Sequence, residues 1–176
     1  MRPKPLAIIA VVAPLFFAAV PATALAAGAT AKAGLAQAQQ AATKWKADAA
    51  LANVSTLAAS TDGTAQKWAY LFFSAKAKLG YAVDVADGKV VETLEVRPHI
   101  SDPIGGEFID SPQAMAEAIK NGLKTKGKPA ISLLIMGQAT KNPGAYWSVG
   151  GGYLPGEVGV MIDARTGKFF ARQEIK

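Results

Sequence analysis

The sequence is similar to itself when it is displaced by 79 residues. In this register residues 51–97 align without gaps with residues 130–176, and seven positions are identical, including Trp68 with Trp147 and Asp84 with Asp163. Apolar positions coincide as well, such as Val54 with Leu133, Leu57 with Met136 and Val83 with Ile162. Similarity at a fixed displacement predicts two copies of one supersecondary unit.

A helical pattern precedes the aligned region in each half. In the first half it runs over about residues 31–49, with Leu35, Ala38, Ala42 and Trp45 at helical spacing. In the second half Asp110 or Ser111 is suited to cap a helix, Pro112 suits its first turn, and Gln113 is able to reach back to the cap. Asn121 and Gly122 tolerate the left-handed conformation in which helices end.

Strand-like stretches follow each expected helix. Asp87-Gly88 lies between two alternating runs, which is a strong signal of a hairpin, and Thr166-Gly167 has the same place in the second half. The expected strand regions are residues 51–58, 67–73 and 79–96, then residues 131–136, 146–149 and 158–170. We therefore expect an α+β fold with two tandem units, each a helix packed on a small antiparallel β-sheet. The pattern leaves open whether the two sheets join.

The first 26 residues have the features of a secretory signal peptide. Arg2 and Lys4 precede an apolar run from Leu6 to Val20, which is too short to span a bilayer comfortably. The small residues around Ala26 fit a cleavage site. We therefore expect residues 1–26 to be a signal peptide, followed by a first unit at residues 27–97 and a second unit at 98–176, without a stable membrane span after cleavage.

Composition excludes several classes of function. There are no cysteines, so no disulfide or thiolate is available. Removing Arg2 and Lys4 with the signal peptide reduces the formal net charge from +6 to +4, and the lysines are not interleaved with aromatic residues as on a nucleic-acid surface. We expect a periplasmic or secreted bacterial protein that binds no nucleic acid and needs no metal or organic cofactor.

Two short motifs resemble the PepSY domain family. They are residues 109–114, which open the second helix, and residues 160–168, which read Val-Met-Ile-Asp-Ala-Arg-Thr-Gly-Lys and close a hairpin. The first half departs from the second motif at residues 84–89, Asp-Val-Ala-Asp-Gly-Lys. The resemblance covers about residues 31–176 as two divergent units. It implies a secreted or membrane-attached module that binds without catalysis, with inhibition of a peptidase as the proposed role.

The residues whose chemistry is suited to catalysis have simpler interpretations. His99 is the single histidine and lies in the expected linker, without the partners of a catalytic triad or a zinc site. Asp84 and Asp163 each precede a turn, where a carboxylate accepts hydrogen bonds from the turn's backbone N–H groups. Residues 150–152 are glycines but lack the Lys-Ser or Lys-Thr that a nucleotide-binding loop needs.

Aromatic residues near these glycines form the predicted binding site. Trp68 and Trp147 match across the repeat, and core packing is the first interpretation of both. A groove or sheet edge flanked by Tyr146, Trp147 and Tyr153 is the surface that we expect to take up a peptide.

Three hypotheses about function follow from the sequence. The first is a non-catalytic module that binds a protein or peptide partner in the envelope and possesses no catalytic residues. The second is a structural or assembly protein of the envelope. The third, a small hydrolase, is disfavoured because the polar constellation that such chemistry needs is missing.

Overall fold

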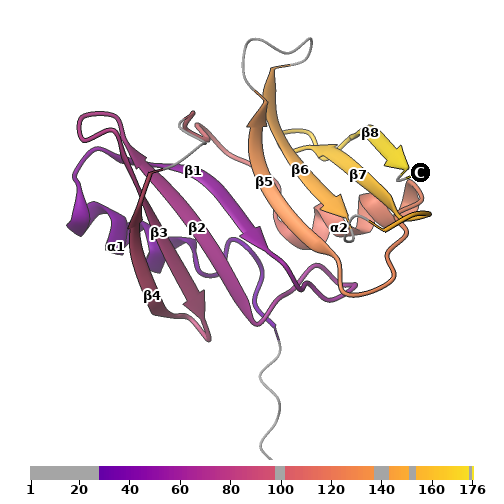
Figure 1. Ribbon diagram of the computed structural model, residues 1–176, viewed down its shortest axis with the longest axis horizontal. Helices are drawn as coiled ribbons and strands as arrows, with labels where there is room; N and C mark the ends of the chain where they lie inside the picture. The colour runs from indigo at the N-terminus through magenta and orange to yellow at the C-terminus, as the bar shows by residue number, and fades with distance from the viewer. Residues whose placement is uncertain (1–27, 98–101, 137–142, 151–153, 175) are drawn as a thin grey trace, which may run out of the picture.

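The computed structural model describes residues 28–97, 102–136, 143–150, 154–174 and 176 (Figure 1). Two helices and eight strands follow one another in these residues. In chain order they are α1 (Leu35–Trp45), β1 (Ala49–Thr56), β2 (Lys67–Ser74), β3 (Leu79–Ala86), β4 (Lys89–Val96), α2 (Ser111–Lys120), β5 (Ala130–Met136), β6 (Gly144–Gly150), β7 (Val158–Asp163) and β8 (Phe169–Glu174).

All eight strands belong to one antiparallel sheet in the order β4-β3-β2-β1-β5-β6-β7-β8. The expectation of two tandem units, each a helix on its own small sheet, is therefore wrong. The chain is mostly β, with two short helices and a continuous sheet. The physical reason is that β1 and β5 would each leave a row of unpaired backbone groups at the edge of a separate four-stranded sheet. Pairing β1 with β5 over three residues of each strand satisfies part of both edges at once.

The β1–β5 ladder is short and is supported by one side chain. Val54 lies opposite Leu133, and Thr56 opposite Ile131. The Asn53 side-chain amide donates to the Ser132 hydroxyl at 2.9 Å and to the Leu133 carbonyl at 2.8 Å. Beyond this point the two strands diverge (Figure 1), and the backbone N–H of Ile104 donates to the Leu51 carbonyl.

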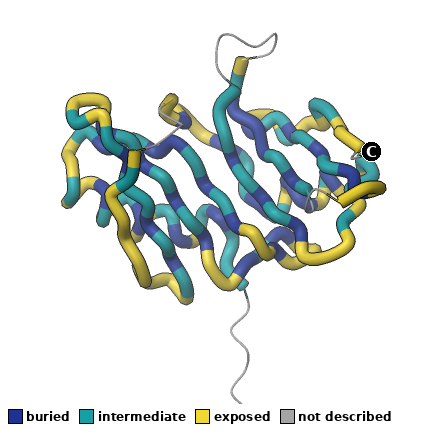
Figure 2. The backbone as a smooth tube through the Cα atoms, in the orientation of Figure 1, coloured by how far each residue is buried: buried dark blue, intermediate teal, exposed yellow. Residues whose placement is uncertain are grey.

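The core lies on the side of the sheet that carries the helices. Tyr70, Val54, Leu133 and Trp147 are successive cross-strand partners on this side, and all four are fully buried. Their neighbours along each strand are more exposed, which gives the alternation of dark blue and teal along the central strands in Figure 2. Trp68 is also buried, so the packing interpretation of Trp68 and Trp147 is confirmed.

The helix boundaries follow from local chemistry. The predicted capping box of α2 is confirmed: Asp110 caps the helix, and the Gln113 side chain accepts the Asp110 backbone N–H at 3.1 Å. Asn121 is the C-cap and Gly122 has a φ of +87°. Helix α1 is shorter than the expected range of 31–49, because residues 31–34 form turns and Lys46 is extended.

The opposite side of the sheet carries neither helix, and its side chains are identified by the register. Leu94 pairs with Ala82, Ala82 with Leu71, and Leu71 with Asn53, in line across four strands. Ala82, Leu71 and Asn53 each lie one residue along their strand from a buried residue of the helix-covered side, such as Val83 beside Ala82, and Leu94 lies beside Thr93, the partner of Val83. Apolar side chains therefore reach the helix-free side of the sheet near β4.

Candidate binding surface

The structure places two of the three predicted site residues in the interior. Trp147 is fully buried, and its indole N–H donates to the Ile109 carbonyl at 3.0 Å. Tyr146 is 5% exposed and packs against Phe170, with ring centroids 4.4 Å apart. Tyr153 lies outside the described residues, as do Gly151 and Gly152. The structure does not bring these aromatics together on one accessible surface among the residues it describes.

The sheet topology also determines which strands have a free edge to which a peptide could add as a further strand. Strand β6 carries Tyr146 and Trp147 and pairs with β5 on one side and β7 on the other. Both of its edges are therefore occupied. The two outer strands of the sheet are β4 and β8.

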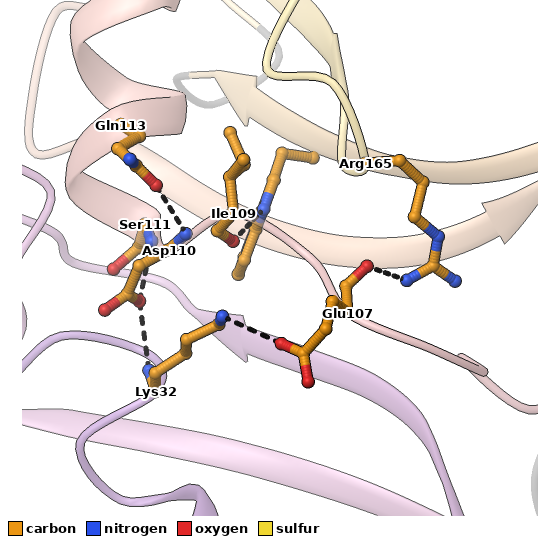
Figure 3. A network of polar contacts seen from close by, with 8 residues as sticks. Lys32, Glu107, Ile109, Asp110, Ser111, Gln113 and Arg165 are labelled. Carbon is orange, nitrogen blue, oxygen red and sulfur yellow. Dashed lines mark hydrogen bonds and ion pairs between the residues drawn. The ribbon is translucent and has the colours of Figure 1, made fainter.

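Polar contacts around the start of α2 hold the two halves together (Figure 3). The Lys32 backbone N–H donates to Asp110 at 3.0 Å, and the Lys32 ammonium lies 3.6 Å from the Glu107 carboxylate. Arg165 donates to the Glu107 carbonyl and reaches this segment from the β7–β8 turn. All these groups bind segments of the chain to one another, which is a structural role.

The two aspartates singled out in the sequence behave differently. The Asp163 carboxylate accepts the backbone N–H groups of Arg165 at 2.9 Å and Thr166 at 2.7 Å, and the Thr166 hydroxyl, as predicted. These hydrogen bonds, the Thr166 N–H first among them, lower the pKa of Asp163. Asp84 instead forms an ion pair with Lys67 at 2.5 Å, so the turn role predicted for it is wrong.

The length of the two hairpin turns explains this difference. Strand β3 continues two residues beyond Asp84 to Ala86, and the chain reverses tightly at Asp87 and Gly88, both with positive φ. Strand β7 ends at Asp163 itself, so its carboxylate faces the longer turn.

No group of three or more His, Asp or Glu side chains converges among the described residues in a way that could hold a metal ion. His99 lies outside the described residues. The expectations of no cofactor and no catalysis stay predictions.

Strand β4 presents a long free edge with apolar side chains. It pairs only with β3 among the described strands, and seven of its eight residues are exposed. Val91 and Leu94 are 57% and 59% exposed. We call the free edge of β4, together with Leu71, Leu94 and Val96 on the helix-free side, the β4 surface.

Helix α1 fixes β4 from the other side of the sheet. The Trp45 ring stacks on Tyr81 with centroids 4.8 Å apart, and its indole N–H donates to the Glu95 carboxylate at 2.9 Å. A β-bulge lies opposite Asp84 and Val85, so the regular part of β4 runs from Glu92 to Val96. The regular edge is therefore five residues long, and helix α1 holds it through the Trp45–Glu95 hydrogen bond.

Sequence reasoning missed the β4 surface. Its alternating pattern was visible at Val90–Val96, but the pattern does not distinguish an edge strand from an inner one. That distinction depends on the order of the strands in the sheet, in which β4 pairs with β3 alone and lies at one end.

Comparison with known proteins supports the fold alone. No family model matches the chain, and no curated protein matches it. A putative lipoprotein from Clostridium difficile 630 has a similar solved structure, with a TM-score of 0.54 and 13% identity, over 80% of this chain and 92% of that one. The Bacillus megaterium YpeB C-terminal domain has a TM-score of 0.34 and 13% identity, over 82% of this chain and 65% of that one.

At 13% identity the first of these likenesses indicates a shared architecture and nothing about activity. The second is too weak to argue from. Within the described residues, neither helix has the length and apolar character needed to cross a bilayer.

Proposed function

We propose that the protein is a non-catalytic binding module of the PepSY type, exported by its predicted signal peptide, which holds an extended segment of a partner protein along β4. The observation that carries this proposal is the free edge of β4 with its exposed apolar side chains, among them Val91 and Leu94. Exposed strand edges bind extended peptides by adding a strand to the sheet.

The side chains of the β4 surface favour an apolar peptide. Main-chain hydrogen bonds to β4 would supply affinity, and alternate peptide side chains would lie beside Leu94 and Val96 on the helix-free side. Val90 and Glu92 flank the bulge at the other end of the strand. Bulges oppose strand addition, so the five residues from Glu92 to Val96, beyond the bulge, are the proposed contact.

Strand β8 is the less suitable edge. It has six residues, and its exposed C-terminal part consists of Arg172, Gln173 and Glu174. Charged and strongly polar edges discourage pairing with another chain. Strand β4 is charged too, at Glu92 and Glu95, but it carries three exposed large apolar side chains, Val90, Val91 and Leu94, whereas β8 carries one, Phe169. The edge of β8 therefore serves as an internal control.

The class of partner follows from the resemblance to PepSY domains. The proposed partner is a peptidase in the cell envelope, which the protein would inhibit by forming a stoichiometric complex with it. An assembly role in the envelope is the alternative, and a hydrolase is disfavoured. The division into units at residues 27–97 and 98–176 is part of this proposal, with the β4 surface in the first unit.

Hydrogen exchange with a library of extended peptides tests the binding site. Bound apolar peptides should slow exchange at the amides of Glu92–Val96 and leave those of β8 unchanged. Leu94→Lys should weaken binding about tenfold or more, because a charge replaces an apolar contact. Phe169→Lys on β8 is the matched control and should bind as the wild type does.

The result that contradicts the proposal is protection confined to β8, or equal weakening by both substitutions. If peptides bind at β4 but envelope peptidases retain full activity with excess protein, the inhibitory role fails and the binding role stands.

A further inference from the structure

A groove lies beside α2, at a distance from the β4 surface. Its walls are the loop after β1, at Ala59–Thr61, and the segment from Leu123 to Pro129. Helix α2 contacts β6 and β7, whereas β4 is at the other end of the sheet. A ligand in this groove is therefore independent of a peptide on β4.

The floor of the groove is apolar and its size suits a small molecule. Met115 and Ile119 contribute from α2, with Leu123 beyond the helix end. Ile119 is 50% exposed, although it belongs to the apolar stripe of the helix. The hollow has a volume of about 580 Å³, within the range of about 300–1,000 Å³ that is usual for ligand pockets.

Lysines are concentrated on the rim. Residues 120–128 contain four, namely Lys120, Lys124, Lys126 and Lys128, and all are exposed. Lys124 and Lys128 line the groove, and neither makes an ion pair with any residue that the structure describes.

The nearby acidic groups already have partners within the protein. Glu117 lies 3.4 Å from the Lys120 ammonium. Glu157 is buried and accepts the backbone N–H groups of Lys126 and Leu154. Asp62 accepts the backbone N–H and hydroxyl of Thr64. The positive charge of Lys124 and Lys128 is thus left for a ligand.

We infer that this groove binds a small anionic amphiphile, a carboxylate on an apolar chain. The chain would lie against Ile119 and Leu123, above the buried Met115, and the carboxylate between Lys124 and Lys128. Burial of apolar surface and a charge-assisted hydrogen bond would then both stabilise the same bound molecule. The hydroxyls of Ser60, Thr61 and Thr125 lie at the same rim.

Titration of the protein with decanoate, followed by NMR of its methyl groups, tests the inference. Decanoate should shift the methyl signals of Ile119, Leu123 and Met115. Decanol lacks the charge and acetate lacks the chain, so the affinity of each should be at least about tenfold lower than that of decanoate. The Leu94 methyl signals, on the β4 surface, should not move.

Substitutions separate specific binding from general attraction. The double variant Lys124→Ala/Lys128→Ala should weaken decanoate binding about tenfold, the order expected for two partly exposed ion pairs. The matched control Lys89→Ala/Lys168→Ala removes the same charge elsewhere and should change nothing. Equal weakening by both pairs would overturn the inference. So would binding to vesicles of anionic lipid without binding of monomeric decanoate, since that outcome indicates a membrane surface instead.

Discussion

Val54 of β1 lies directly opposite Leu133 of β5 in the ladder that joins the two halves of the sheet. The two residues are 79 positions apart, which is also the displacement that aligns the sequence with itself. Each half therefore presents the same strand edge to the other, as in an isologous contact between two subunits. The origin of the halves as copies of one unit stays a prediction.

Because the ladder is central, truncating Leu133 should destabilise the whole molecule. Leu133→Ala removes a fully buried side chain and should lower the free energy of unfolding by about 2–5 kcal/mol. Urea unfolding, followed by circular dichroism and by tryptophan fluorescence, should show a single transition, and its midpoint should fall by the same amount with both probes. Leu57→Ala is the control, because Leu57 is 86% exposed, and should cost less than about 0.5 kcal/mol. Two separate transitions would contradict the single cooperative sheet.

Local features of the fold were predictable because they depend on few neighbouring residues. The turn at Asp87-Gly88 needs positive φ at both positions, and the structure has +50° and +69° there. The capping box at Asp110 and Gln113 likewise depends on four consecutive residues. Such signals are complete within a short window of sequence.

The joining of the halves was not predictable in the same way. Strands β1 and β5 have the alternating pattern of any strand with one buried side, and nothing in it specifies the partner across the edge. For the same reason the apolar residues of β4 did not indicate a free edge. Trp147 was proposed as a contact and as a core residue, and only its burial distinguishes the two.

Gly63 should be intolerant of any side chain. It has a φ of +80°, and a Cβ there would lie 2.6 Å from the Ser111 carbonyl oxygen. Gly63→Ala combines backbone strain with a clash against the start of α2, so we expect a loss of more than about 3 kcal/mol in unfolding free energy. Gly88→Ala is the matched control, since its φ is +69° and its Cβ would meet nothing within 4 Å. That variant should lose about 1–2 kcal/mol, and equal losses would show that the contact with α2 is unimportant.

Asp163 should make stability depend on pH in the acid range. Its pKa is lowered in the folded protein by the Thr166 N–H and its other turn donors. A lowered folded pKa contributes stability above the unfolded value of about 3.9, which is lost as the pH falls through the folded pKa. Asp163→Asn should therefore flatten the rise of unfolding free energy with pH below about pH 4. Some slope should remain, because Asp48, Asp62 and Glu157 also have lowered pKa values. An unchanged slope would show that the turn does not depend on the charge.

Trp147→Phe distinguishes a structural role of this residue from a binding role. The indole N–H of Trp147 donates to the Ile109 carbonyl, just as that of Trp68 donates to the Ala29 carbonyl at 2.8 Å. Each bond ties a strand to the segment that leads into a helix. The Ala29 carbonyl also accepts the Ala65 backbone N–H at 2.9 Å, so it keeps one partner when the Trp68 bond is lost. Trp147→Phe and Trp68→Phe should each cost about 1–3 kcal/mol of unfolding free energy, measured by urea unfolding.

Neither substitution should change the affinity of a peptide for β4, measured by titration calorimetry at a temperature where both variants are folded. If Trp147→Phe weakens binding and Trp68→Phe does not, Trp147 takes part in recognition, and the partner must reach the second half of the sheet. If both leave affinity unchanged, the two tryptophans serve the core alone, and the search for contacts narrows to the exposed residues of β4.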